Sequence, residues 1–276
     1  MATKKPAAST RKTVKKPAPS VKKTATKVTT VKAAPAVATA RTSRFKFSRA
    51  PLLAASVAEF IGTFLLAAII LAASGQPLFV LFAVLAIVLV LGGVSGAHLN
   101  PALTIGALAT RRITLVRAVS YIVAQVLGAL MALVILNAFV SAAPEVSEQA
   151  QSFGQSAPTL FSAPSLADGK EWTVLSAELI GSVVLAFGVA AGLRSRSRLT
   201  HAFTYAGALY VAAMLAGTAA NYVGASAILN PAVAGSLQAL KFELWPVLIY
   251  VVTPLVGAVL GFALSDLLEA ENEPVV

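Results

Sequence analysis

From residue 51 onward, the chain consists of long apolar runs separated by short polar breaks. The 51 residues between Glu59 and Arg111 carry no charge. As one straight helix they would extend about 77 Å, more than twice the roughly 30 Å hydrocarbon core of a bilayer. The run must therefore turn back on itself, and turn-forming residues lie at 74–77 and at the glycines of 92–96. A second uncharged run, 199–240, also exceeds one crossing.

These breaks predict six membrane-spanning helices, each close to the roughly 20 residues that a bilayer requires. We expect them at about 51–73, 78–95, 114–139, 173–193, 202–222 and 245–268. Two apolar segments are left over, 100–110 and 230–240, and each would reach only about 16 Å as a helix. The predicted fold class is an all-α membrane protein with six transmembrane helices and two re-entrant half-helices.

The two halves of the chain resemble each other. Residues 58–68 read AEFIGTFLLAA and residues 177–187 read AELIGSVVLAF, and the motif Leu-Asn-Pro-Ala also occurs once in each half. With three spans per half, the halves must cross the membrane in opposite directions, which is an inverted 3+3 repeat. We expect repeat one at about 51–140 and repeat two at about 173–268.

The repeated motif is Asn100-Pro101-Ala102 in the first half and Asn230-Pro231-Ala232 in the second. Asn is a favoured N-cap residue and Pro is tolerated at the first helical position, so each motif predicts the start of a half-helix. Inverted symmetry brings the two starts together near mid-membrane, where irregular backbone must be buried or face water. The helix N-termini would oppose cations, and the Asn NH₂ groups would donate to water. The arrangement predicts a pore for neutral molecules that interrupts proton transfer.

The net charge of +11 comes from one segment. Residues 1–50 hold 14 Lys and Arg and no acid, which leaves the remaining 226 residues at −3. We predict a disordered, basic, cytoplasmic tail over 1–50 and a short acidic tail over 269–276. The basic tail suits an anionic lipid surface, with nucleic acid as the less favoured alternative.

Basic residues beside the spans predict the orientation. Both termini would face the cytoplasm, and the loop 140–172 would be external, in the plasma membrane. Six arginines then lie inside: Arg111, Arg112, Arg117, Arg194, Arg196 and Arg198. Only Lys170 and Lys241 fall outside. The chain has no cysteine, and it shows no catalytic triad, phosphate-binding loop or metal-ligating cluster, so an enzyme is not predicted.

Over about residues 51–268, the chain resembles the aquaporin and glycerol-facilitator family, the major intrinsic proteins. The resemblance is carried by AEFIGTF, SGAHLNPALTIG, AELIGS, the second Asn-Pro-Ala, and Pro254 with Gly257. It implies passive flow of water or small uncharged solutes such as glycerol, urea or ammonia. It also implies one pore per subunit, a homotetramer, and no cofactor or metal.

The selectivity filter departs from the family pattern. Most members have an Arg directly after the second Asn-Pro-Ala, and this chain has Val233. By the family's spacing, the other filter positions fall on Val80, Thr218 and Ala227. These side chains are small or mid-sized, and only Thr218 offers a hydrogen bond. We therefore expect a wide bore and weak selection for water alone.

Two acids and a histidine allow alternative interpretations. Glu59 and Glu178 lie within predicted spans, and intramembrane acids suggest proton coupling, so a proton-coupled transporter is an alternative function. We favour a structural role in which each accepts backbone N–H donors before a half-helix. His98 is expected to hydrogen-bond within its loop. His201 resembles a pH-gating histidine of plant relatives, although an exposed, solvated residue is the simpler expectation.

Overall fold

The computed structural model describes residues 51–270. The predicted basic tail and residues 271–276 of the predicted acidic tail lie outside the described residues. Within 51–270, every regular element is helical, and six helices are long and apolar enough to span a bilayer. Five of them are single α-helices: α1 Pro51–Ala72, α2 Pro77–Ser95, α4 Leu115–Ser141, α6 Glu171–Arg194 and α7 Arg198–Asn221. The sixth is the segment Leu244–Glu269.

The sixth span has three parts. It runs from α9 (Leu244–Val247) through a π-helical turn at Leu248–Val252 into α10 (Thr253–Ala270). Pro254 lies just after the widened turn, and proline cannot donate the backbone hydrogen bond that a regular α-helix would require there. The irregularity is therefore explained by the sequence.

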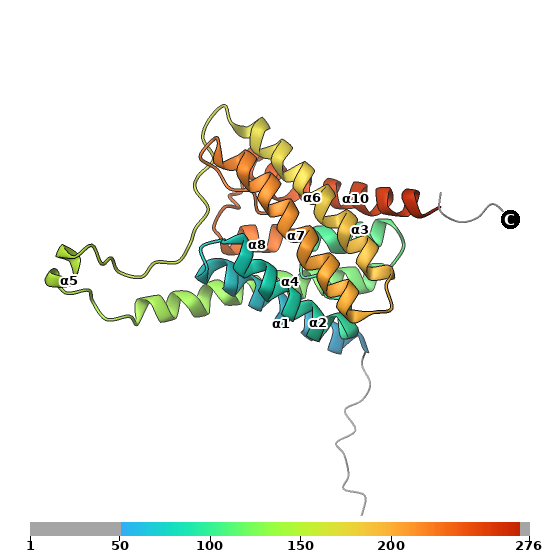
Figure 1. Cartoon of the computed structure of the whole chain (residues 1–276), viewed down its shortest axis with the longest axis horizontal. Coiled ribbons are helices and arrows are strands. Elements are labelled where there is room, and N and C mark those ends of the chain that lie inside the picture. Colours follow the sequence, from blue (N-terminus) through green and yellow to red (C-terminus); the bar gives the residue numbers. More distant parts are fainter. Residues whose placement is uncertain (1–50, 271–276) are drawn as a thin grey trace, which may run out of the picture. The chain divides into compact units, whose positions relative to one another are not determined.

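Two short helices enter the bundle without crossing it. They are α3 (Pro101–Ala109) and α8 (Pro231–Ser236), at the positions expected for the half-helices (Figure 1). The second is shorter than the predicted 230–240, because Gln238 adopts a left-handed φ of 57° and the Ala239 N–H turns back to the carbonyl of Ala234. A further short helix, α5 (Glu148–Ser152), lies in the long loop 142–170.

Helix packing repeats between the halves. In the first half α1 packs against α4, and in the second half α6 packs against α10, while α2 and α7 join the halves. A Cβ on Gly128 of α4 would collide with the α1 backbone at Phe60, and a Cβ on Gly257 of α10 would lie 3.0 Å from the backbone oxygen of Leu179 in α6. Both glycines therefore allow close helix contact at equivalent points of the repeat.

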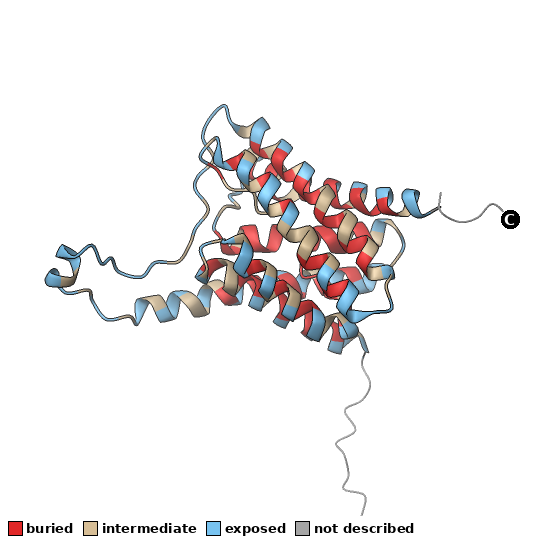
Figure 2. Cartoon of the chain, viewed as in Figure 1, coloured by how far each residue is buried: buried red, intermediate tan, exposed pale blue. Residues whose placement is uncertain are grey.

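Burial separates the inner and outer faces of each long helix. Figure 2 shows buried positions on the sides of the helices that face one another and exposed positions on the outer sides. The exposed positions include many large apolar residues, such as Phe79, Phe82 and Val90 on α2. Apolar outer faces of this kind suit contact with lipid chains.

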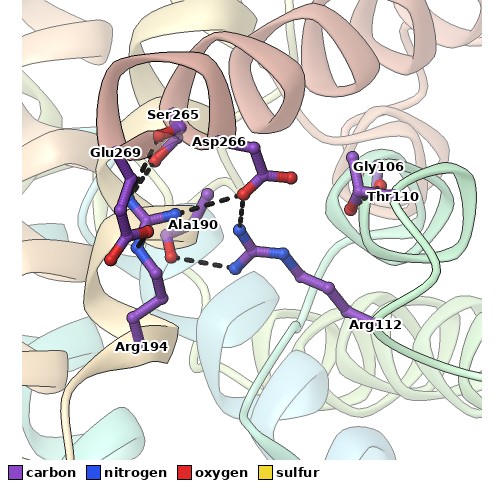
Figure 3. Close-up of polar contacts among 8 residues, drawn as sticks. All are labelled: Gly106, Thr110, Arg112, Ala190, Arg194, Ser265, Asp266 and Glu269. Atoms are coloured by element: carbon purple, nitrogen blue, oxygen red, sulfur yellow. Dashed lines mark hydrogen bonds and ion pairs between the residues drawn. The ribbon is translucent and has the colours of Figure 1, made fainter. Parts of the chain in front are cut away.

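At one end of the bundle, ion pairs join three elements (Figure 3). Arg112, just after α3, pairs with Asp266 of α10 and donates to the backbone oxygen of Ala190 in α6 at 3.0 Å. Arg194 of α6 lies 3.2 Å from the same Asp266 carboxylate oxygen and pairs with Glu269. Arg112 and Arg194, which the sequence marked only as orientation signals, thus fasten the end of α3 to α6 and α10.

Candidate pore and selectivity filter

Each half-helix begins with an asparagine cap. The Oδ1 of Asn100 accepts the N–H of Ala102 at 2.8 Å, and the Oδ1 of Asn230 accepts the N–H of Ala232 at 3.1 Å. Pro101 and Pro231 occupy the first helical positions, where a missing N–H costs no hydrogen bond. The cap fixes each Asn side chain at the tip of its half-helix.

The two tips are joined by reciprocal hydrogen bonds. Asn100 Nδ2 donates to the backbone oxygen of Leu229 at 2.8 Å, and Asn230 Nδ2 donates to the backbone oxygen of Leu99 at 2.9 Å. The Asn NH₂ groups were expected to donate to water, but one N–H of each Asn instead binds a backbone carbonyl of the opposite repeat.

The residue before each Asn has an unusual backbone. Leu99 and Leu229 have left-handed φ values of 54° and 62°. This conformation costs about 1–2 kcal/mol for a residue with a Cβ, so surrounding contacts must hold it in place. It directs each leucine carbonyl to the opposite Asn amide, and the same strain occurs at equivalent points of both repeats.

Two fully buried carboxylates hold these strained segments. Glu59 of α1 accepts the N–H groups of His98 at 2.8 Å and Leu99 at 2.7 Å. Glu178 of α6 accepts the N–H groups of Ile228 at 2.5 Å and Leu229 at 2.9 Å. These bonds match the structural role favoured for both acids.

The first carboxylate has an additional partner that sequence reasoning did not identify. Gln125 of α4 donates from Nε2 to Glu59 at 2.7 Å and to Thr104 at 3.0 Å. Thr104 in turn lies 3.2 Å from His98 Nδ1. His98 therefore hydrogen-bonds within the local network, as expected for it. Gln125 gave no sequence signal beyond being polar within an apolar span.

A cavity of about 720 Å³ lies next to the Asn pair. Its lining includes both asparagines and all four predicted filter residues, Val80, Thr218, Ala227 and Val233. No charged residue is among the described residues that line it. Polar groups on the wall come instead from Asn, Thr, Ser, Gln and Tyr side chains.

The filter residues differ in exposure. Val80 and Val233 are buried, at 7% and 1% exposure, and Ala227 is half-buried. Thr218 lies on an exposed side of α7. Thr218, the one filter residue with a hydrogen-bonding side chain, is thus the most exposed of the four while it also lines the cavity.

Two further wall residues come from the long loop between α4 and α6. Phe161 and Pro164 line the cavity, and the N–H of Ala163 donates to the carbonyl of Leu237 beyond α8 at 3.2 Å. The Phe161 ring also lies beside Gly75 in the turn between α1 and α2. Sequence reasoning missed these residues because an irregular loop has no periodicity to indicate which side chain points inward.

His201 differs from its expected environment. The expectation of an exposed, solvated histidine is wrong, because the residue is only 7% exposed and its Nε2 has no hydrogen-bond partner among the described residues. Its ring packs where Gly92 of α2 and Gly192 of α6 leave room. The burial follows from those two glycines, whose effect is invisible in the local sequence around His201.

Together, these features define a class of protein: an integral membrane channel built from an inverted repeat, with two half-helices meeting at a lined cavity. The family model described as Major intrinsic protein matches residues 46–265. The chain belongs to the major intrinsic protein family, whose members are channels for water or small solutes and not enzymes.

Relatives of known type support this assignment. The chain is 32% identical over 227 residues to glycerol uptake facilitator protein-like 6 of Lactiplantibacillus plantarum, covering 78% of this chain and 98% of that protein. It is 41% identical over 97 residues to the probable aquaporin PIP2-5 of Arabidopsis thaliana, covering 35% of this chain but only 30% of the plant protein. The X-ray structure of the aquaglyceroporin from Plasmodium falciparum shares the fold, with a TM-score of 0.57 and 20% identity over 78% of this chain and 96% of that one.

Proposed function

We propose that this protein is a passive channel that conducts water together with small uncharged solutes of glycerol size. The observation that carries the proposal is the lining of the cavity, which reaches the Asn pair without a charged side chain among the described residues. A charged solute would lose hydration there without gaining a counter-charge, whereas a neutral one exchanges hydrogen bonds with wall hydroxyls and amides.

The filter supports solutes larger than water. An Arg after the second Asn-Pro-Ala would place a guanidinium in the cavity wall, and the chain has the short apolar Val233 instead. Val80 and Ala227 add no hydrogen-bonding group. Solutes with carbon atoms as well as hydroxyl groups, such as glycerol, suit a wall that is largely apolar with a few polar points.

We also propose the assembly and orientation that family resemblance and charge suggest. The chain would form a homotetramer in the plasma membrane, with both termini cytoplasmic. The six loop arginines lie at one side of the predicted topology, and this supports the orientation by the positive-inside rule. The basic tail over 1–50 would contact anionic lipid.

Proteoliposomes test the channel directly. Light scattering after an osmotic step would give water permeability, and the slower re-swelling phase would give permeability to glycerol, urea and ammonia. We expect faster water and glycerol flux than in empty vesicles. No increase for any of these permeants would refute the proposal.

The same vesicles separate the channel from the alternatives. A proton-coupled transporter would respond to an imposed pH gradient and would lose flux in Glu59→Gln and Glu178→Gln variants. The channel predicts flux that is independent of the pH gradient. A membrane-tethered nucleic-acid binder predicts that deletion of residues 1–45 removes the function, whereas the channel predicts unchanged permeability after that deletion.

A further inference from the structure

The cavity extends along most of α7 and stops before that helix begins. Its lining on α7 runs from Asn221 to Tyr205, which is a rise of about 24 Å along the helix axis. The same row of the helix continues one turn further to His201, which is buried and is not among the described residues that line the cavity. The first residue of α7, Arg198, lies about 10 Å beyond Tyr205. Tyr205 therefore lies at one end of the cavity, which we call its inner end.

At this inner end, Tyr205 reaches from α7 to the segment that precedes the first half-helix. Its hydroxyl donates to the carbonyl of His98 at 2.7 Å, and His98 lies two residues before Asn100. Tyr205 and His98 are buried, at 1% and 3% exposure. A carbonyl this close to the Asn pair is a group to which a permeating water or hydroxyl could donate. The Tyr205 hydroxyl therefore occupies a position that a permeant would otherwise use.

Two other tyrosines show which bonds of this kind the fold requires. Tyr121 of α4 donates to the carbonyl of Ser95 at 2.8 Å, and Tyr250 of the sixth span donates to the carbonyl of Ser226 at 3.2 Å. Each tyrosine comes from the third span of its half and holds the loop before a half-helix. Because this bond occurs in both repeats, it belongs to the common architecture of the two halves.

The bond from Tyr205 has no such counterpart. The second span of the first half, α2, has only apolar residues and glycine over 78–94, so no side chain there can donate to the opposite loop. Ile228 has the place of His98 in the second half, and it lines the cavity, whereas His98 is not among the described residues that do. The Tyr205 bond therefore marks a difference between the two ends of the path and is not a requirement of the repeat.

We propose that Tyr205 is a gate. In this conformation it closes the pore on the inner side of the Asn pair, and conduction requires its hydroxyl to leave the His98 carbonyl and its ring to turn out of the path. This inference rests on the proposed channel function. A gate lies in series with the filter, so it changes the fraction of time for which the pore conducts and acts equally on water and glycerol. A change at the filter would instead alter the ratio of the two permeabilities.

The chain contains a matched control for this tyrosine. Tyr205→Phe and Tyr121→Phe each remove one hydroxyl from a fully buried ring, and each hydroxyl donates to a carbonyl of the same loop. Tyr205 lines the cavity, whereas Tyr121 is not among the described residues that do. The two variants therefore lose a similar hydrogen bond, and only the first loses it at the proposed gate.

The experiment measures water and glycerol permeability in proteoliposomes at several temperatures for the wild type, Tyr205→Phe, Tyr205→Ala and Tyr121→Phe. We expect Tyr205→Phe to raise both permeabilities about fivefold, which corresponds to about 1 kcal/mol, the size of one net hydrogen bond. Tyr205→Ala should raise them further and make flux less dependent on temperature, because no ring has to move. Tyr121→Phe should match the wild type. Unchanged flux in both Tyr205 variants, with a conducting wild type, would overturn the inference alone, and so would a rise in glycerol permeability without a rise for water.

A second measurement covers the case in which Tyr205→Ala does not fold. The chain has no cysteine, so Tyr205→Cys and Tyr121→Cys each introduce a single thiol. Tyr205→Cys should conduct faster than the wild type, and a small water-soluble thiol reagent should lower its flux again, because the attached group refills the position of the ring. The same reagent should leave Tyr121→Cys unaffected. A conducting Tyr205→Cys that is insensitive to the reagent would overturn the inference. If neither the wild type nor any Tyr205 variant conducts water or glycerol, the proposed function is refuted and the inference with it.

Discussion

The two buried carboxylates offer a quantitative test, because the structure gives them different numbers of donors. Glu59 accepts three hydrogen bonds, from the N–H groups of His98 and Leu99 and from Gln125. Glu178 accepts two, and one of its donors, the N–H of Ile228, is only partly buried. Glu59→Ala should therefore destabilise the protein more than Glu178→Ala does.

The size of the effect follows from the count of orphaned donors. A buried donor left without a partner costs about 1–3 kcal/mol in a soluble protein, and hydrogen bonds within membrane bundles average about 0.6 kcal/mol. Taking about 1–2 kcal/mol per donor, we expect losses of roughly 3–6 kcal/mol for Glu59→Ala and roughly 2–4 kcal/mol for Glu178→Ala. Both are large fractions of a typical unfolding free energy.

The assay is an unfolding titration with denaturing detergent in mixed micelles, followed by circular dichroism. A third variant tests the extra donor: adding Gln125→Leu to Glu59→Ala removes the orphaned N–H, and it should recover only part of the lost unfolding free energy because it also removes the Gln125 hydrogen bond to Thr104. If Glu178→Ala proves as destabilising as Glu59→Ala, or more so, the donor count does not determine the stability of these sites.

Three further predictions concern the filter, the loop and the ion pairs. Val233→Arg should reduce the ratio of glycerol to water permeability about tenfold, which requires a free-energy barrier for glycerol that is higher by only about 1.4 kcal/mol. An unchanged permeability ratio in re-swelling assays would place the filter elsewhere. Phe161→Ala should raise glycerol permeability, because it removes an aromatic side chain from the cavity wall; equal re-swelling rates would show that this ring does not restrict flux. Asp266→Ala should lower the unfolding free energy by no more than about 1 kcal/mol, because its carboxylate is 44% exposed. That loss should shrink in high salt, and a salt-independent loss would contradict an electrostatic role.

The number of membrane crossings, the inverted halves and the half-helix starts could be predicted from the sequence, because they depend on signals that repeat along the chain. Uncharged runs set the number of crossings, and the paired AEFIGTF and AELIGS segments indicated the inverted halves. The Asn-Pro motifs located the starts of α3 and α8, because proline at the first helical position is a strong local signal. The described helices agree with these expectations to within a few residues.

Features that depend on contacts between distant segments could not be predicted. The cavity wall includes Phe161 because its loop is held at Ala163, 74 residues before its partner Leu237. His201 is buried because glycines on two other helices leave space for its ring. Gln125 stabilises the Glu59 carboxylate because it lies within hydrogen-bond distance of it, and no periodic pattern in the sequence indicates that these two side chains are close. In each case the chemistry of the residue was visible and its neighbours were not.

The Asn pair connects the stability of the fold to the proposed selectivity. Each amide is held at two points, since its oxygen caps its own half-helix and one N–H binds the opposite repeat. An amide group is planar, so these two bonds also fix the direction of the second N–H. In the proposed channel, that second N–H of Asn100 and of Asn230 would be a rigid donor whose orientation is set before any solute arrives.

The carboxylates of Glu59 and Glu178 stabilise this arrangement indirectly. Each accepts the backbone N–H of a strained leucine, and the carbonyl of that leucine accepts the N–H of the Asn in the opposite repeat. Loosening either carboxylate should therefore disturb the donors at the pore centre as well as the unfolding free energy, even though neither acid is among the described residues that line the cavity.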